Sequence, residues 1–456
     1  MILSMVPFVL SMAGCTSGVT VSTKEGPLQG FTAKVLDKEI QVFLGIPYAK
    51  PPVGNLRFNK PQASEPWLGL YDATRARDSC VQPPFPEVFN IPTALSEDCL
   101  YLNVWTPLAS TVQKFPVLVW FHGGMFQVGS AYEARYNGSA LAALNDVVVV
   151  SCNFRLSVLG FLDLNHATTP GNVALWDQQT ALQWVQRNIM AFGGDPGSVT
   201  VFGESSGSMM VHGHILSPHS RGLFHRVFLM SGTMSSDSSV YSASESIAGL
   251  NTISEAVGCG PYERASDPGE LLHCLRERTA HDLCAVKMAI MRPTYENEFI
   301  PCRPSFAMKE GYFENYDAMV SVTANEGAFV FNIHPDKGVL DDDLSSYELE
   351  RLKDSLKVLL RIFIRKRPGT TAMNYVDNAY VENNDELRNV VARVLGNWLF
   401  YCPARLFAEK KPALPDGMEL PKFTPEHPDF MWLEGGNYTV AEHFASAACD
   451  MWKEYL

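Results

Sequence analysis

The residue best suited to chemistry in this chain is a serine in a glycine-flanked pentapeptide. The run Gly-Glu-Ser-Ser-Gly occupies residues 203–207, directly after a β-branched stretch and directly before a stretch with helical spacing. In that strand–turn–helix context, G-x-S-x-G forms a sharp turn that holds the serine above a sheet as a nucleophile. The glycines allow the tight turn because they carry no side chain. We therefore predict Ser205 as a nucleophile, against the alternative of a plain turn serine.

A serine that attacks a carbonyl carbon needs hydrogen-bond donors for the oxyanion that develops. Gly123 and Gly124 follow closely on the continuous apolar run 116–121, which is typical of a strand buried on both faces. Because glycine has no side chain, the backbone N–H groups of these residues can approach a substrate oxygen closely. Together with the N–H of Ser206 they are predicted to form an oxyanion hole, against the alternative of an ordinary glycine turn.

The elements that must position these groups alternate between buried strands and helices. Residues 174–190 have helical spacing, and the run Gly-Gly-Asp-Pro at 193–196 ends that helix. Residues 341–367 have the pattern of an amphipathic helix packed on the outside. Such alternation predicts an α/β fold in which a mostly parallel sheet is covered by helices on both faces. The strands are expected at residues 116–121, 146–152, 199–202 and 226–230.

The size and composition favour one large globular domain. The chain has 456 residues, of which 46% are hydrophobic and 19% are charged, and it contains no Pro/Ser-rich linker and no internal repeat. These values are typical of a globular protein with a large core, and we expect a single domain over residues 19–456. The formal net charge of −13 argues against nucleic acid or an anionic membrane surface as a partner. It suits a cationic substrate or a solvated acidic surface.

The N-terminus and the sequons favour an extracellular chain. Residues 1–14 are mostly apolar but too few to span a bilayer, so residues 1–18 are predicted as a signal peptide, with an N-terminal strand as the alternative. No later segment is long and apolar enough to cross a membrane. N-glycosylation sequons begin at Asn137 and Asn437. None of the ten cysteines forms C-x-x-C, so no metal site is expected.

With these motifs the chain resembles the type-B carboxylesterase and cholinesterase family of α/β hydrolases, from about Val19 to the C-terminus. The run Ser-Glu-Asp-Cys-Leu-Tyr-Leu-Asn-Val at 96–104 resembles one family signature. The run Phe-Gly-Glu-Ser-Ser-Gly at 202–207 resembles the active-site signature, with Ser206 where alanine is usual. The resemblance implies an α/β-hydrolase fold and hydrolysis of a small carboxylic ester through an acyl-enzyme on Ser205. That chemistry needs no cofactor.

The resemblance also implies an acidic partner and two neighbouring groups. The run 320–329 resembles the family segment that carries the acid, which makes Glu326 the candidate for orienting a base imidazole. An ordinary loop glutamate is the alternative. Ser231 resembles a buried serine beside that acid, and Glu204 resembles the carboxylate that flanks the nucleophile. For both residues a structural role is an equally good interpretation.

No histidine after Glu326 matches the family's general base. The family places that base in a His-Gly-x-acid segment, whereas the histidines after Glu326 are His334, His427 and His443, and none is followed by Gly-x-acid. His334 is also too close to Glu326 in the sequence. His427 and His443 are therefore the weak candidates, with exposed loop or helix histidines as the alternative.

The missing base coincides with a short C-terminal region. Residues 401–408 and 420–426 resemble family segments that are normally separated by a strand, the histidine loop and a helix. Here only residues 409–419 lie between them, so an internal truncation is expected at this point. We accordingly predict an ester hydrolase of weak or no activity. The alternatives are a non-catalytic cholinesterase-like binding or adhesion protein, or a protein that sequesters esters.

The resemblance further implies three disulfides and bears on the substrate. The implied bridges are Cys80–Cys99, Cys259–Cys274 and Cys402–Cys449, each worth about 3–4 kcal/mol on a chain-entropy model. The state of Cys284 and Cys302 is left open. Counting back from Cys99, Phe89 stands where a cholinesterase has a tryptophan that binds quaternary ammonium. A general carboxylesterase is therefore favoured over a choline esterase.

Overall fold

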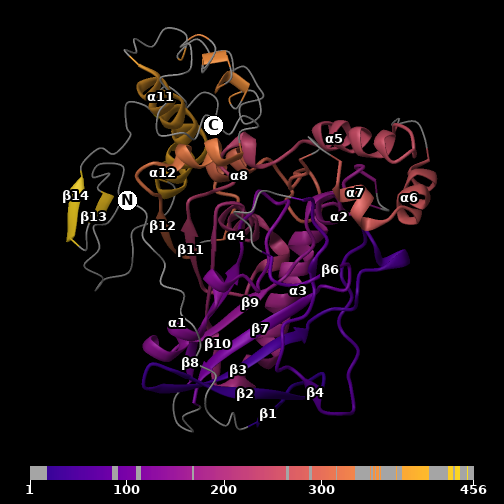
Figure 1. Ribbon diagram of the computed structural model, residues 1–456, viewed down its shortest axis with the longest axis vertical. Coiled ribbons are helices and arrows are strands. Elements are labelled where there is room, and N and C mark those ends of the chain that lie inside the picture. The colour runs from indigo at the N-terminus through magenta and orange to yellow at the C-terminus, as the bar shows by residue number, and fades with distance from the viewer. Residues whose placement is uncertain are drawn as a thin grey trace.

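The computed structural model describes a central β-sheet with helices packed around it (Figure 1). The described residues are 18–84, 91–108, 114–166, 169–262, 267–286, 290–314, 316–333, 383–409, 430–434 and 437–441, together with 350, 353–354, 356–358, 360, 376 and 449. Residues 1–17 of the predicted signal peptide, most of the predicted helix at 341–367 and residues 410–419 of the predicted truncation lie outside this set. The same holds for His334, His427, His443 and Phe89.

The main sheet formed by the described residues has the strand order β1-β2-β3-β7-β9-β8-β10-β11-β12, with β4 paired to β2. Its strands are β1 (Gly18–Ser22), β2 (Pro27–Val35), β3 (Lys38–Pro47), β4 (Tyr71–Asp72), β7 (Tyr101–Pro107), β8 (Phe115–Phe121), β9 (Val148–Cys152), β10 (Gly194–Glu204), β11 (Arg226–Met230) and β12 (Asp317–Ser321). Pairing is antiparallel along the order from β1 to β9 and parallel from β9 to β12. The predicted α/β-hydrolase fold is confirmed, although the sheet as a whole is mixed, and its parallel half carries Ser205.

Helices surround this sheet. The α-helices are α1 (Ser139–Asn145), α2 (Ser157–Phe161), α3 (Val173–Asn188), α4 (Ser206–Leu216), α5 (Ala243–Ala256), α6 (Pro268–Glu277), α7 (Ala280–Cys284), α8 (Pro304–Glu310), α11 (Asn384–Gly396) and α12 (Cys402–Glu409). Shorter helical turns are η1 (Gly54–Leu56), η2 (Ala134–Tyr136), η3 (Ile189–Phe192), η4 (Pro218–Ser220), η5 (Asp237–Ser239), η6 (Glu326–Ile333) and the π-helical η8 (Asn397–Tyr401). Two further strand pairs are β5 (Ser79–Cys80) with β6 (Leu95–Ser96), and β13 (Phe430–Glu434) with β14 (Asn437–Ala441).

The residues of β9 show how the sheet separates two core clusters. Val149 packs with Ala142 and Ala143 of α1 in the smaller cluster. Val148 and Val150 belong to the larger cluster, which includes apolar side chains of α3 and α4. Successive side chains of a strand point to opposite faces of the sheet. Helix α1 therefore covers one face and helices α3 and α4 cover the other, as the continuous apolar strands require.

The helix predicted at 174–190 is present with slightly different bounds. Helix α3 spans Val173–Asn188, and η3 extends the helical path to Phe192. Gly193 then adopts φ 79° and ends it. This left-handed conformation is easy for glycine because no Cβ is present to clash with the backbone. The chain next enters β10, which leads directly to the predicted nucleophile.

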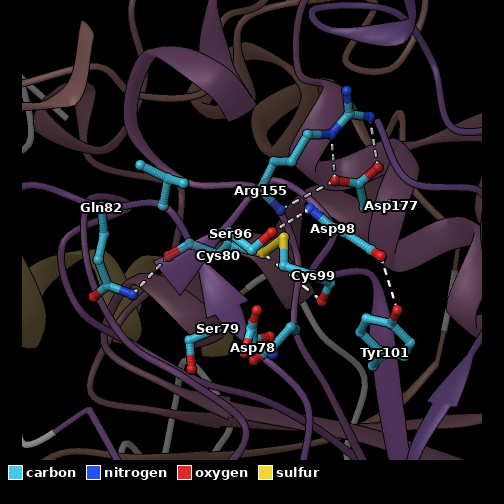
Figure 2. Close-up of a disulfide and its surroundings, with 12 residues drawn as sticks. Asp78, Ser79, Cys80, Gln82, Ser96, Asp98, Cys99, Tyr101, Arg155 and Asp177 are labelled. Atoms are coloured by element: carbon cyan, nitrogen blue, oxygen red, sulfur yellow. Dashed lines mark hydrogen bonds and ion pairs between the residues drawn. A yellow bond between two sulfur atoms is a disulfide. The ribbon is translucent and has the colours of Figure 1, made fainter. Parts of the chain in front are cut away.

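The three implied disulfides, Cys80–Cys99, Cys259–Cys274 and Cys402–Cys449, are all present. Cys152, Cys284 and Cys302 are free thiols. The first bridge lies beside a buried ion pair between Arg155 and Asp177 (Figure 2). Persistent disulfides are typical of oxidising compartments. In the part of the chain that the structure describes, no helix has the length and apolarity to cross a membrane.

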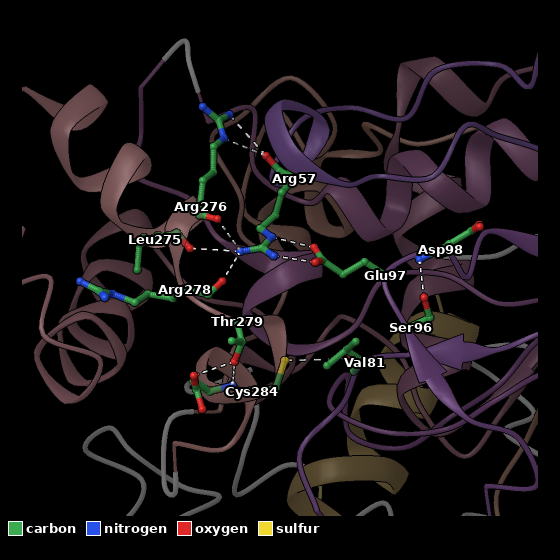
Figure 3. Close-up of polar contacts among 11 residues, drawn as sticks. Arg57, Val81, Ser96, Glu97, Asp98, Leu275, Arg276, Arg278, Thr279 and Cys284 are labelled. Carbon is green, nitrogen blue, oxygen red and sulfur yellow. Dashed lines mark hydrogen bonds and ion pairs between the residues drawn. The ribbon is translucent and has the colours of Figure 1, made fainter.

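A second buried arginine ties the loop of the first disulfide to helix α6 (Figure 3). The guanidinium of Arg57 makes a two-pronged contact with Glu97, with Nε–Oε1 at 2.6 Å and Nη2–Oε2 at 2.5 Å. Its Nη1 donates to the carbonyl oxygens of Leu275, Arg276 and Arg278, at 3.2, 3.1 and 2.7 Å. These carbonyls lie at the C-terminus of α6, where the helix dipole favours a cation.

Candidate active site

The predicted nucleophile stands at a strained turn between β10 and α4. Strand β10 ends at Glu204 and helix α4 begins at Ser206, so Ser205 alone connects them. Ser205 adopts φ 55° and ψ −125°, a conformation that costs a non-glycine residue about 1–3 kcal/mol. Its N–H donates to the carbonyl of Met230 at 2.9 Å, which pins the turn to β11. Ser205 as a residue is partly exposed.

The flanking glycines are required by close packing. A Cβ built on Gly207 would lie 2.2 Å from the carbonyl oxygen of Phe121. A Cβ on Gly203 would lie 2.6 Å from the carbonyl carbon of Gly207. Real Cβ atoms do not approach backbone this closely, so any larger residue would push α4 away from β8. The pentapeptide therefore has the geometry that its sequence predicts.

The two glycines after β8 lie beside the nucleophile. A Cβ on Gly123 would be 3.2 Å from the Cβ of Ser205. Gly124 adopts φ 118°, and a Cβ there would meet the carbonyl oxygen of Val128 at 2.0 Å. Within the described part of the chain, the N–H groups of Gly123 and Gly124 donate to no protein acceptor. These N–H groups are therefore not occupied by protein acceptors, which an oxyanion hole would require, and their role as oxyanion donors stays a prediction.

The third predicted donor, Ser206, is the first residue of α4 and is buried. Its hydroxyl accepts a hydrogen bond from the backbone N–H of Phe126 at 3.2 Å. The side chain of Ser206 therefore fastens the glycine loop after β8 to the start of α4. An alanine, the residue usual in this motif, would lack that bond.

The predicted acid and its neighbouring serine are in direct contact. The Ser231 hydroxyl donates to Oε1 of Glu326 at 2.6 Å, and the backbone N–H of Thr323 donates to the same oxygen at 2.6 Å. Glu326 begins η6 and is 8% exposed. The Tyr401 hydroxyl donates to the carbonyl of Thr323 at 2.5 Å, which links this loop to η8. Glu326 is thus held in one orientation.

Glu204 has a different environment from Glu326. Burial is the main cause that raises its pKa to about 7, and the neighbouring charges of Glu326 and Glu133 add to the effect while Arg135 opposes it. Among the described residues, no group donates a hydrogen bond to its carboxylate. A Cβ on Gly123 would lie 2.8 Å from its Oε2. This carboxylate therefore borders the same glycine as the nucleophile does.

Three charged or polar residues of this region were not predicted from the sequence. Glu133, Arg135 and Tyr136 lie at η2, shortly after the glycine loop. Arg135 Nη2 contacts Glu133 Oε2 at 2.5 Å, and the guanidinium lies 4.9 Å from the Tyr136 ring centre. Burial raises the pKa of Glu133. In the sequence, only their position between the two glycines and the Asn137 sequon could have indicated that these residues lie near the site.

The buried histidines of the described chain have other partners. His122 stacks on Phe154 with ring centres 4.3 Å apart, and burial lowers its pKa to about 4. His214 contacts Ser220 and Gln178, and burial lowers its pKa to about 3. His212 accepts a hydrogen bond from the Met234 N–H. No histidine within the described ranges hydrogen-bonds to Ser205 or Glu326, and His427 and His443 lie outside them.

Comparisons with known proteins identify the family of the chain. The family model described as "Carboxylesterase family" matches residues 17–415. The chain is 35% identical over 407 residues to a protein named "Cholinesterase" from Mus musculus, and the alignment covers 86% of this chain and 67% of that protein. The activity that the family's description names, that of a carboxylesterase, is the hydrolysis of small-molecule carboxylic esters. Given its fold, its serine elbow and these matches, the chain belongs to the carboxylesterase family.

Proposed function

We propose that this chain is a serine carboxylic ester hydrolase that forms an acyl-enzyme on Ser205 and hydrolyses it with low turnover. The observation that carries the proposal is the strained turn at Ser205, a partly exposed residue that stands next to Gly123. Strain of this kind is retained where function needs it. A small ester carbonyl that contacts Ser205 Oγ can direct its oxygen toward the free N–H groups of Gly123 and Gly124.

Each part of the site has a defined role in this proposal. Ser205 attacks the ester carbonyl, and the amides of Gly123 and Gly124 stabilise the tetrahedral oxyanion by about 3–4 kcal/mol per donor. Glu326, which Ser231 and Thr323 hold in one orientation, stands at the position of the acid in the family resemblance. Turnover is low because no histidine has the family's His-Gly-x-acid context. Loss of the base histidine costs on the order of 10⁶ in kcat in the best-studied serine hydrolase.

Labelling with a fluorophosphonate probe tests this proposal. We expect slow labelling of the wild-type chain and none of a Ser205→Ala variant, because the probe reacts only with an activated serine. Both proteins should show the same thermal unfolding curve, which controls for folding. If a folded wild-type chain is not labelled, the proposal is wrong. Tight binding of an ester without hydrolysis would then favour the alternative of an ester-binding protein.

We further propose that the protein is secreted and carries an N-linked glycan at Asn137. The support is the disulfides together with the exposure of Asn137, whose Oδ1 accepts a hydrogen bond from the N–H of Ser139 at 2.9 Å. Asn437, the other sequon, begins β14. Expression in a secretory eukaryotic cell should deliver the chain to the medium. Enzymatic deglycosylation should increase its electrophoretic mobility, and Asn137→Gln should reduce that increase.

A further inference from the structure

We propose that Glu204, the residue immediately before the nucleophile, serves as the general base for acyl transfer in this chain. This inference rests on the proposed acylation of Ser205. It assigns to Glu204 the step that a histidine performs in other serine hydrolases. It also gives a chemical reason for the low turnover, because a glutamate in this place has no orienting partner like that of a triad histidine.

The geometry around Gly123 carries the proposal. One point, the position of an ideal Cβ on Gly123, lies 2.8 Å from Glu204 Oε2 and 3.2 Å from Ser205 Cβ. The carboxylate and the nucleophile side chain therefore border the same small space next to the proposed oxyanion donors. A general base must reach the proton that it removes, either directly or through one water molecule. No hydrogen bond joins Ser205 to Glu204 directly in the described chain, so the route through one water molecule is the one that this geometry supports.

The carboxylate of Glu204 is also free to accept a proton. Among the described residues, Glu326 accepts two hydrogen bonds, from Ser231 and Thr323. Glu133 contacts Arg135 and accepts from the Ser130 N–H. No comparable donor within the described ranges binds Glu204. Its lone pairs are thus available to a water molecule that also contacts the Ser205 hydroxyl.

The charged groups that face Glu204 suit this role. They are Glu326 from η6, and Glu133, Arg135 and Tyr136 from the η2 region. Burial and the two carboxylates raise the pKa of Glu204 to about 7, and Arg135 limits the increase. A base is most effective when its pKa lies near the working pH. An ordinary exposed glutamate would be too weak a base for this step.

The proposed reaction conserves protons throughout. As Ser205 Oγ attacks the ester carbonyl, its proton passes through one bridging water molecule to Glu204 Oε2. The tetrahedral intermediate collapses, the bond to the alcohol oxygen breaks, and the protonated Glu204 returns the proton to that leaving oxygen. During hydrolysis of the acyl-enzyme, a water molecule gives a proton to Glu204, and the oxygen of that water attacks the acyl carbonyl. Collapse releases the acid, and Ser205 Oγ recovers the proton.

The pre-steady-state acylation rate with an activated aryl ester, measured from about pH 5 to about pH 9, tests the proposal. Ser205→Ala supplies the background rate. We expect the wild-type rate to rise with pH around a midpoint of about 7. Glu204→Gln should lower the rate by about 10²–10⁴-fold and abolish that rise. Glu204→Asp should keep the rise at a reduced rate, because the carboxylate is retained but shorter.

Glu133→Gln is the matched control. It removes another buried carboxylate of the same cluster without altering the group next to Ser205. The rise should be retained and should move to lower pH, because one like charge near Glu204 is lost. Thermal unfolding of every variant separates a loss of catalysis from a loss of folding. A purely structural Glu204 would change stability and leave the pH midpoint in place.

Three outcomes overturn the proposal, and they are distinguishable. If Glu204→Gln keeps both the rate and the rise, Glu204 is not the base. If His427→Ala or His443→Ala abolishes the rise instead, a histidine is the base and the proposed function stands. If the wild-type chain shows no acylation that depends on Ser205, the proposed function fails together with this inference.

Discussion

Two regions of the molecule bury charged side chains, and they do so in opposite ways. In the first region, Asp177 faces Arg155 and Glu97 faces Arg57, each through two contacts between guanidinium and carboxylate. In the second region, around Ser205, the carboxylate of Glu204 has no hydrogen-bond donor among the described residues. The first arrangement stabilises charge by pairing it. The second leaves a partly buried carboxylate without a donor where we propose that protons move.

The paired region acts as a scaffold. Arg155 and Asp177 are 4% and 0% exposed, and the Arg155 N–H and Nη1 make further bonds to Asp177 Oδ2 and to the carbonyl of Asn59. Asp177 lies on α3, so the pair holds this helix against the loop that follows β9. A buried charge that loses its partner is costly, because its desolvation is no longer offset.

The largest effect should follow from breaking this pair. Arg155→Leu leaves Asp177 buried and unpaired, so we expect the free energy of unfolding to fall by about 3–5 kcal/mol. Urea denaturation measures the change. The double variant Arg155→Leu/Asp177→Leu removes both charges and should recover most of the loss. Equal stabilities of the single and double variants would contradict the view that an unpaired charge causes the effect.

Removing the charge of Glu204 should instead increase the free energy of unfolding. Its pKa is raised from 4.5 to about 7 in the folded state, so the folded protein binds this proton more tightly than the unfolded chain does. Wild-type stability should therefore fall as the pH rises through this window. Glu204→Gln removes the effect, and should increase the free energy of unfolding by on the order of 3 kcal/mol above about pH 7 and by little below about pH 4.5.

A matched Glu→Gln change in the scaffold sharpens this contrast. Glu97→Gln weakens a charge-assisted contact with Arg57, and we expect the free energy of unfolding to fall by about 1.5–3 kcal/mol at neutral pH. Urea denaturation near pH 8 compares both variants directly. If Glu204→Gln and Glu97→Gln change stability in the same direction, the distinction between paired and unpaired carboxylates is wrong.

The difference between the two regions also explains what the sequence could predict. The turn at Ser205 was predictable because strand, glycines and helix are adjacent in the chain and each restricts the next. The contact of Ser231 with Glu326 and the three disulfides followed from the family resemblance. None of these pairs could have been derived from spacing alone.

Other features depend on contacts distant in sequence and were missed. Glu133 and Arg135 precede Glu204 by about 70 residues, and only the parallel pairing of β8 with β10 brings their loops together. The mixed character of the sheet was likewise not predicted, because the antiparallel N-terminal strands β1 to β3 have no signature that gives their position at its edge. The degree of burial of Glu204, and hence its pKa, is also a tertiary property.

The smallest change in stability should come from substituting Ser231, which donates a single hydrogen bond to the carboxylate of Glu326. Its hydroxyl is one of two donors to Glu326 Oε1, so Ser231→Ala should lower the free energy of unfolding by about 1–2 kcal/mol. Ser231 also adopts φ 53°, a conformation that glycine tolerates better than alanine. Ser231→Gly should therefore be less destabilised than Ser231→Ala in urea denaturation. If the glycine variant is the less stable of the two, backbone strain at this position is not a significant cost, and the hydroxyl alone accounts for the contribution of Ser231 to stability.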